Sequence, residues 1–164
     1  MISNMFRHFG WMKAKREGDA GQSLVETALT LPILVLVLLG GAELARVAFA
    51  AIEVSNAAKA AVQYGAQTTG AAKDIPGMTT AATDDASDLT LMGATLTMSP
   101  APTISCICAN GNASTCAVGD CTGSTIEHVL TVATTATLNP LIHAPGLPTT
   151  YTLHGNAVQK ILGN

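Results

Sequence analysis

A chain of 164 residues has room for one modest domain and an anchoring segment, and it excludes two large domains. Charged residues make up 12% of the chain and aromatic residues 4%, so most of its apolar content consists of small side chains outside one dense segment. Residues 22–164 carry four basic and nine acidic side chains, a net charge of −5, which argues against a nucleic-acid partner.

Residues 1–21 are predicted to form a basic cytoplasmic leader. Arg7, Lys13, Lys15 and Arg16 outnumber the acidic residues of this segment. Lys and Arg beside a membrane segment are retained in the cytoplasm. The chain is therefore predicted to cross the inner membrane once, with its N-terminus inside and its C-terminal part outside.

An apolar segment follows the leader. Sixteen uncharged residues separate Glu26 from Glu43, and as a helix they cover about 24 Å, slightly less than the roughly 30 Å of a hydrocarbon core. With a few flanking residues the membrane span is predicted at about 24–43. It belongs to an N-terminal helix region, 22–66, whose helix is expected to run from about Ser23 to about Tyr64. Pro32 should allow a kink or local melting.

The outer half of this helix is predicted to be amphipathic. Its apolar residues recur at three- and four-residue steps, which is typical of one buried helix face. They are Leu44, Val47, Ala51, Val54, Ala58, Ala61 and Val62.

A linker is predicted at 67–88, followed by a β-rich extracytoplasmic domain at 89–164. Strands are predicted at 89–98, 102–109, 128–138 and 149–162, where β-branched residues or period-two alternation occur. Proline and glycine at Pro140, Pro145-Gly146 and Pro148 separate the last two strands. We therefore predict an α+β fold, in which a small antiparallel sheet or meander lies against the outer half of the helix.

Four cysteines lie within residues 106–121: Cys106, Cys108, Cys116 and Cys121. An even, clustered set in an oxidising compartment favours two disulfides, and the spacing lacks the paired C-x2-C knuckles of common zinc sites. Asn110-Gly111-Asn112 marks a hairpin turn. Nested pairing of Cys106 with Cys121 and Cys108 with Cys116 suits such a hairpin, although three pairings are open.

Motifs of enzyme chemistry are missing from the sequence, and no catalytic residue, metal or cofactor is predicted. The four histidines form no H-E-x-x-H pattern, and neither a G-x-S-x-G elbow nor a phosphate-binding loop is present. Glu127 and His128 are adjacent, yet neighbours on a strand point to opposite faces.

The residues around the apolar segment resemble a prepilin-type signal. Gly21 is followed by four residues and Glu26, then by an apolar run with an early proline, Pro32, and a second acid, Glu43. This pattern is similar to that of the TadE-like pseudopilins, or minor pilins, of tight-adherence (Flp, type IVc) pilus systems. Thr27 stands where many such signals carry an aromatic residue.

The resemblance implies a pilin-like fold and a structural role in pilus assembly. It implies cleavage by a prepilin peptidase between Gly21 and Gln22, and pairing of Glu26 with the new α-ammonium group of an adjacent subunit. Such pairing makes a carboxylate in lipid far less costly. The implied partners are the prepilin peptidase, other pseudopilins, the major pilin and the inner-membrane assembly platform.

Two other functions remain open at this point. One is a secreted β domain released by ordinary signal peptidase after Ala50, because Ala48-Phe49-Ala50 is a formal A-x-A site. The other is an anchored extracytoplasmic domain that is never cleaved and whose binding function is unknown.

Overall fold

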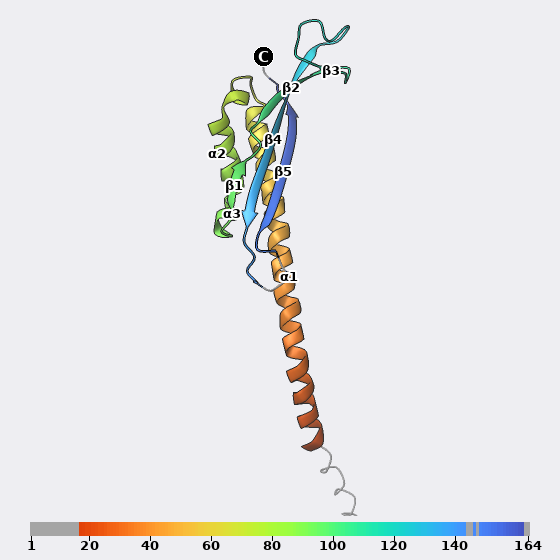
Figure 1. Ribbon diagram of the computed structural model, residues 1–164, viewed down its shortest axis with the longest axis vertical. Helices are drawn as coiled ribbons and strands as arrows, with labels where there is room; N and C mark the ends of the chain where they lie inside the picture. Colours follow the sequence, from red (N-terminus) through yellow and green to blue (C-terminus); the bar gives the residue numbers. More distant parts are fainter. Residues whose placement is uncertain (1–16, 144–145, 147, 163–164) are drawn as a thin grey trace, which may run out of the picture. The chain divides into compact units, whose positions relative to one another are not determined.

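The computed structural model describes residues 17–143, 146 and 148–162, in two compact units that divide between Ala42 and Glu43. The basic residues Arg7, Lys13, Lys15 and Arg16 of the predicted leader, and Pro145 of the predicted turn, lie outside these residues. The α+β class is confirmed, since a long N-terminal helix precedes a small antiparallel sheet (Figure 1).

Helix α1 covers Glu17–Gly65, so it begins about six residues earlier than predicted and ends close to the predicted Tyr64. The helix continues through Pro32 without melting. In the second unit the buried residues recur at steps of one turn: Ala50, Val54, Ala57, Ala58, Ala61 and Val62. Leu44 was predicted on this face but is 73% exposed, because the buried face passes through Glu43, Val47 and Ala50 and Leu44 lies to one side of it.

Residues 67–88 contain helices instead of the predicted linker. Helix α2 covers Ile75–Asp85, after a short 3-10 turn, η1, at Ala71–Lys73, and helix α3 covers Asp88–Leu91. Asp74 caps α2 by accepting a hydrogen bond from the Gly77 N–H at 3.1 Å. Met78 and Ala82, one turn apart, are fully buried, so packing makes this segment part of the core.

The cap of α2 also ties it to α1. The Tyr64 hydroxyl donates to the Asp74 carboxylate at 2.7 Å. This hydrogen bond, together with that from Gly77, lowers the pKa of Asp74, and the same interaction raises the pKa of Tyr64. The side chain that caps α2 is therefore the ionised carboxylate of Asp74.

The sheet is built around β4, Ile126–Leu138. Strands β1 (Thr95–Met98) and β2 (Thr103–Cys108) pair with residues 134–137 and 126–131 of β4, and β5 (Tyr151–Lys160) pairs with residues 129–138. Since β4 pairs with β5 along both stretches, β1 and β2 must follow one another on the opposite edge (Figure 1). The two-residue β3 (Ala113–Ser114) pairs with β2.

This arrangement corrects two predictions. The strand predicted at 89–98 is formed only from Thr95 onward, because Asp88–Leu91 form α3 and bury Leu89. The sheet is antiparallel but is not a meander, since β1 pairs with β4 and not with β2. The predicted strands at 102–109, 128–138 and 149–162 correspond to β2, β4 and β5.

The core lies between α1 and the inner face of β4. Alternate residues of β4 are buried, as period-two alternation dictates: Leu130, Val132, Thr134, Ala136 and Leu138. The Thr134 hydroxyl is satisfied because it donates to the Val54 carbonyl of α1 at 2.7 Å. Gly155 of β5 lies at the same contact, where an added Cβ would be 2.3 Å from the Val54 carbonyl oxygen.

Candidate functional site

The residues predicted for processing and assembly lie near the start of α1. Gly21, Gln22 and Glu26 are all exposed, and a Cβ added to Gly21 would meet no atom within 4 Å. Gly21 and Gln22 are helical, so a peptidase that binds an extended peptide must unwind this turn. The structure places all three residues on an accessible helix end.

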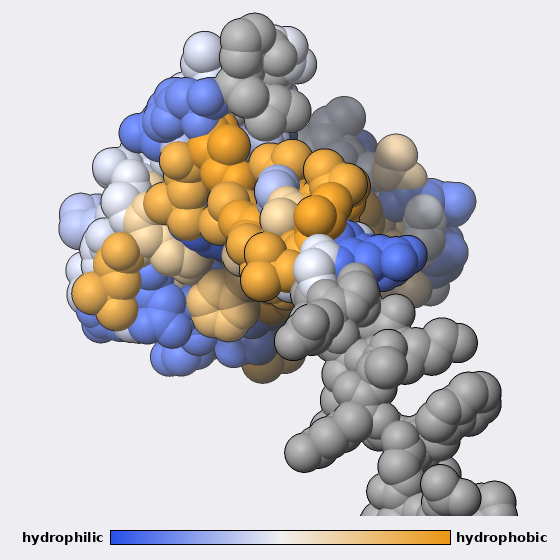
Figure 2. Space-filling view, turned by 90° about the horizontal axis from the view of Figure 1, so that it is seen from below, coloured by the Kyte–Doolittle hydropathy of each residue, from blue (hydrophilic) through white to orange (hydrophobic). Residues whose placement is uncertain are grey.

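The segment that follows exposes nearly all of its apolar side chains. Leu24, Leu29, Leu36 and Leu38 are each about 70% exposed. Apolar atoms gather over this helix when it is seen from its N-terminal side (Figure 2). Within the described residues one helix, over Gly21–Gly65, is long and apolar enough to cross a membrane. A helix that is apolar all round requires an apolar surrounding.

Two hydroxyl groups of the apolar segment bond to the backbone of their own helix. The Thr27 hydroxyl donates to the Ser23 carbonyl at 2.8 Å, and the Thr30 hydroxyl donates to the Glu26 carbonyl. These bonds satisfy the hydroxyls inside the helix, which suits a segment without water.

A charged cluster that the sequence analysis missed lies at the start of the second unit. Both Glu43 carboxylate oxygens accept a hydrogen bond from the Leu141 N–H at 3.3 Å. Arg46 Nη1 lies 3.6 Å from Glu43 Oε1, which makes an ion pair. Arg46 Nη1 donates to the Asn139 carbonyl at 2.9 Å, and Nη2 donates to the Met92 carbonyl at 2.8 Å. The pair therefore ties two loops to α1. The E-x-x-R spacing was the available signal, but it gave no indication of the loops.

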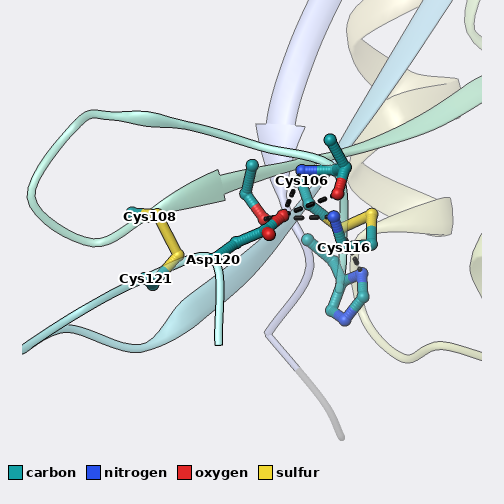
Figure 3. Close-up of a disulfide and its surroundings, with 8 residues drawn as sticks. Cys106, Cys108, Cys116, Asp120 and Cys121 are labelled. Carbon is teal, nitrogen blue, oxygen red and sulfur yellow. Dashed lines mark hydrogen bonds between the residues drawn. A yellow bond between two sulfur atoms is a disulfide. The ribbon is translucent and has the colours of Figure 1, made fainter. Parts of the chain in front are cut away.

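Two disulfides tie the loop after β2: Cys106 to Cys116 and Cys108 to Cys121 (Figure 3). This pairing differs from the nested arrangement that a hairpin suggested. The reason is the register of the short β3 strand, in which Cys106 pairs with Ser114, so that Cys116 is a diagonal neighbour of Cys106. The chain then turns at Cys116, whose φ is 68°, and Cys121 returns to Cys108.

Asp120 holds the centre of this loop (Figure 3). Its Oδ2 atom accepts hydrogen bonds from the Thr115 N–H and hydroxyl, both at 2.7 Å, and from the Ser114 hydroxyl at 3.3 Å. The Thr115 hydroxyl, with a smaller effect from its N–H, lowers the pKa of Asp120. The exposed carboxylate thus orders a segment that has little regular structure.

His128 lies beside the first disulfide, with its Nδ1 atom 3.3 Å from Cys106 Sγ. His128, Cys106 and Cys116 place their ligand atoms within 4.8 Å of one another. Both sulfur atoms belong to the disulfide, however, and only a thiolate is a good metal ligand. Glu127 faces the other way and pairs with Lys160, so the adjacent acid and imidazole do not share a site.

The disulfide pairing leads to a direct prediction. Protein purified under non-reducing conditions should be lighter than the fully reduced chain by the mass of four hydrogen atoms, because two disulfides form. Replacing Cys106 and Cys116 together by serine should leave one disulfide and no free thiol under native conditions.

The matched control replaces Cys106 and Cys121 together, which should leave Cys108 and Cys116 as two titratable thiols. Thiol counting with mass spectrometry separates the two variants. Two free thiols in the first variant and none in the control would contradict the pairing.

These features define an α+β protein with one N-terminal apolar helix suited to membrane anchoring and a sheet domain tied by disulfides. Residues 21–63 match the model of a family described as TadE-like protein. The match confirms, over these residues, the resemblance predicted from Gly21, Glu26, Pro32 and Glu43. No curated protein and no solved structure matches the chain.

Proposed function

We propose that this protein is a minor pilin, or pseudopilin, that acts without catalysis in the assembly of a Flp-type (Tad) adhesive pilus. The family match associates the chain with Tad pilus machinery. The observation that carries the finer proposal is the exposed apolar segment of α1, with the single carboxylate of Glu26 near its start.

The proposed location is the inner membrane, with a single pass through it. The basic residues before α1 favour a cytoplasmic N-terminus. The disulfides support an oxidising compartment for the sheet domain, because such bonds persist outside the cytosol. Residues 1–21 would then be a leader, and the domain from Glu43 onward would be extracytoplasmic.

Glu26 is proposed to act in assembly. Cleavage between Gly21 and Gln22 by a prepilin peptidase would create an α-ammonium group on Gln22. A carboxylate in lipid is costly unless it is paired. Glu26 would neutralise this group on an adjacent pseudopilin or major pilin, and the assembly platform would receive the paired subunits. Small residues such as Gly40 and Gly41 would let neighbouring helices approach closely.

Release by ordinary signal peptidase after Ala50 is the weaker alternative. Ala50 is fully buried in the middle of α1, against the sheet domain. A cut there would also separate Glu43 and Arg46 from the loops that they hold. Nothing in this arrangement favours a released domain over an anchored one.

Processing provides the test. With Gly21→Asp the cells should accumulate full-length precursor and lose piliation, because the peptidase requires a small residue at this position. Native protein should begin at Gln22, as read by N-terminal sequencing and intact mass.

The control is Gly21→Ala, which keeps a small residue and should still be cleaved. A Cβ added at this position would meet no atom within 4 Å, so neither change should disturb packing. A native protein that begins at Ala51 would contradict the proposal and favour the released domain.

A further inference from the structure

Three large apolar side chains are exposed around the Glu43–Arg46 cluster, and we name them the leucine triad: Leu44, Leu91 and Leu141. Their exposed fractions are 73%, 86% and 68%. Leu44 directly follows Glu43, Leu141 donates its N–H to Glu43, and Leu91 directly precedes Met92, whose carbonyl accepts from Arg46. One cluster therefore holds all three positions at the same end of the domain, where α3 and the connection after β4 lie (Figure 1).

At this end of the domain a charged pair is covered while large apolar side chains are exposed. The side chains of Arg46 and Glu43 are only 16% and 11% exposed, and they use loop backbone groups and each other as partners. A surface that faces water usually presents its charges and covers its leucines. Here the charges of the Glu43–Arg46 pair are covered while the leucines around it are exposed, which is the pattern of a surface that meets an apolar phase.

If the apolar run spans a bilayer, its length places Glu43 and Arg46 at the membrane surface. Sixteen uncharged residues, 27–42, cover about 24 Å of helix, against a hydrocarbon core of about 30 Å. A span that is too short thins the bilayer or draws its flanking residues inward. Glu43 directly follows the run, and Arg46 is one turn farther, so both fall within the several ångströms of the interfacial region.

We propose that the leucine triad inserts into the interfacial region of a lipid bilayer and seats the sheet domain on the outer surface of the membrane. The proposal rests on the proposed membrane anchoring of α1. The partner is a lipid surface because Leu44, one member of the triad, lies two residues after the end of the apolar run at Ala42. The acidic residues Asp84, Asp85 and Asp88, just before Leu91, favour neutral over anionic lipid.

Tryptophan fluorescence tests this seating. The full chain carries one tryptophan, Trp11, so Trp11→Phe supplies a background without tryptophan. Leu91→Trp and Leu141→Trp are then reconstituted separately into phosphatidylcholine vesicles whose acyl chains are brominated near the headgroup. Both variants should lose most of their emission relative to unbrominated vesicles.

Two further variants serve as controls, one expected outside the bilayer and one expected deep within it. Val118→Trp, on the disulfide loop, replaces a fully exposed apolar residue outside the cluster and should keep its emission. Leu36→Trp, in the apolar run, should be quenched by bromine placed deeper in the acyl chain if α1 spans the bilayer. Absence of that quenching would overturn the anchoring, and with it the proposed seating.

If Leu36→Trp is quenched while Leu91→Trp and Leu141→Trp keep the emission of Val118→Trp, the anchoring stands and the seating is wrong. An emission shift of Leu91→Trp that depends on protein concentration and not on bromine would also overturn it, because the triad would then contact a second copy of the chain. Quenching that needs added anionic lipid would contradict the choice of a neutral surface.

Discussion

A chain with Glu26→Gln should be cleaved and membrane-resident, yet it should fail to co-purify with its pilus partners, and the cells should carry few or no pili. Glu26 is exposed on an apolar helix, and no side chain among the described residues is shown to pair with its charge. The amide costs less in lipid than the carboxylate, so insertion should be no harder. What is lost is the negative charge proposed to meet a neighbour's α-ammonium group. Affinity capture and counting of pili by electron microscopy provide the measurement.

The control is Glu53→Gln, which removes one carboxylate from the same helix beyond the apolar run. It should leave partner capture and pili at normal levels. Glu26→Asp keeps the charge and should recover part of the piliation. Normal capture and normal piliation by Glu26→Gln would show that Glu26 serves only the helix end, where an acid contributes a fraction of a kcal/mol.

Gly155→Ala should destabilise the sheet domain by about 3 kcal/mol, at the upper end of the usual range for overpacking. The new methyl group would lie 2.3 Å from the Val54 carbonyl oxygen and 2.6 Å from Thr134 Oγ1. Backbone cannot move aside as a flexible side chain can, so α1 and β5 must separate. The buried hydrogen bond between Thr134 and Val54 would then be lost as well. Thermal unfolding of the full chain in detergent should show a midpoint lower by roughly 10 °C.

Gly70→Ala is the matched control for this change. Gly70 has right-handed helical dihedrals, and an added Cβ would make only an ordinary 3.7 Å contact. Its effect on the free energy of unfolding should stay within about 1 kcal/mol and is expected to stabilise slightly. Equal midpoints for the two variants would mean that the helix and the sheet do not approach this closely.

Local patterns were sufficient to predict several elements. The β-branched run before Leu138 and the alternation after Tyr151 predicted β4 and β5, because each pattern is set by residues adjacent in sequence. The apolar run predicted the helix in the same way. The pattern of Gly21, Glu26, Pro32 and Glu43 was sufficient for the family, since all four residues belong to one helix.

Predictions that depended on distant residues were less successful. Residues 67–88 look like a linker until Met78 and Ala82 meet the core, which only the tertiary fold supplies. Helix α3 replaced part of a predicted strand for the same reason, since Leu89 is buried there. The disulfide pairing depends on the register of β3, and the contacts of Glu43 and Arg46 join residues more than 40 positions apart. The spacing of neighbouring residues cannot indicate contacts between residues so far apart in the sequence.

The position of β4 determines the order in which the domain can assemble. Strands β1 and β2 precede β4 in the chain, yet each finds its main partner there. If the part of the chain after the apolar run is exported in sequence order while the N-terminus stays in the cytoplasm, as proposed, both strands and the inner face of α1 emerge before residues 126–138 are available. During this interval two short strands have free edges beside an uncovered apolar helix, and such edges invite pairing with other chains. In that case folding of the domain waits until β4 has been exported, and a chain arrested before β4 would be a target for chaperones and proteases.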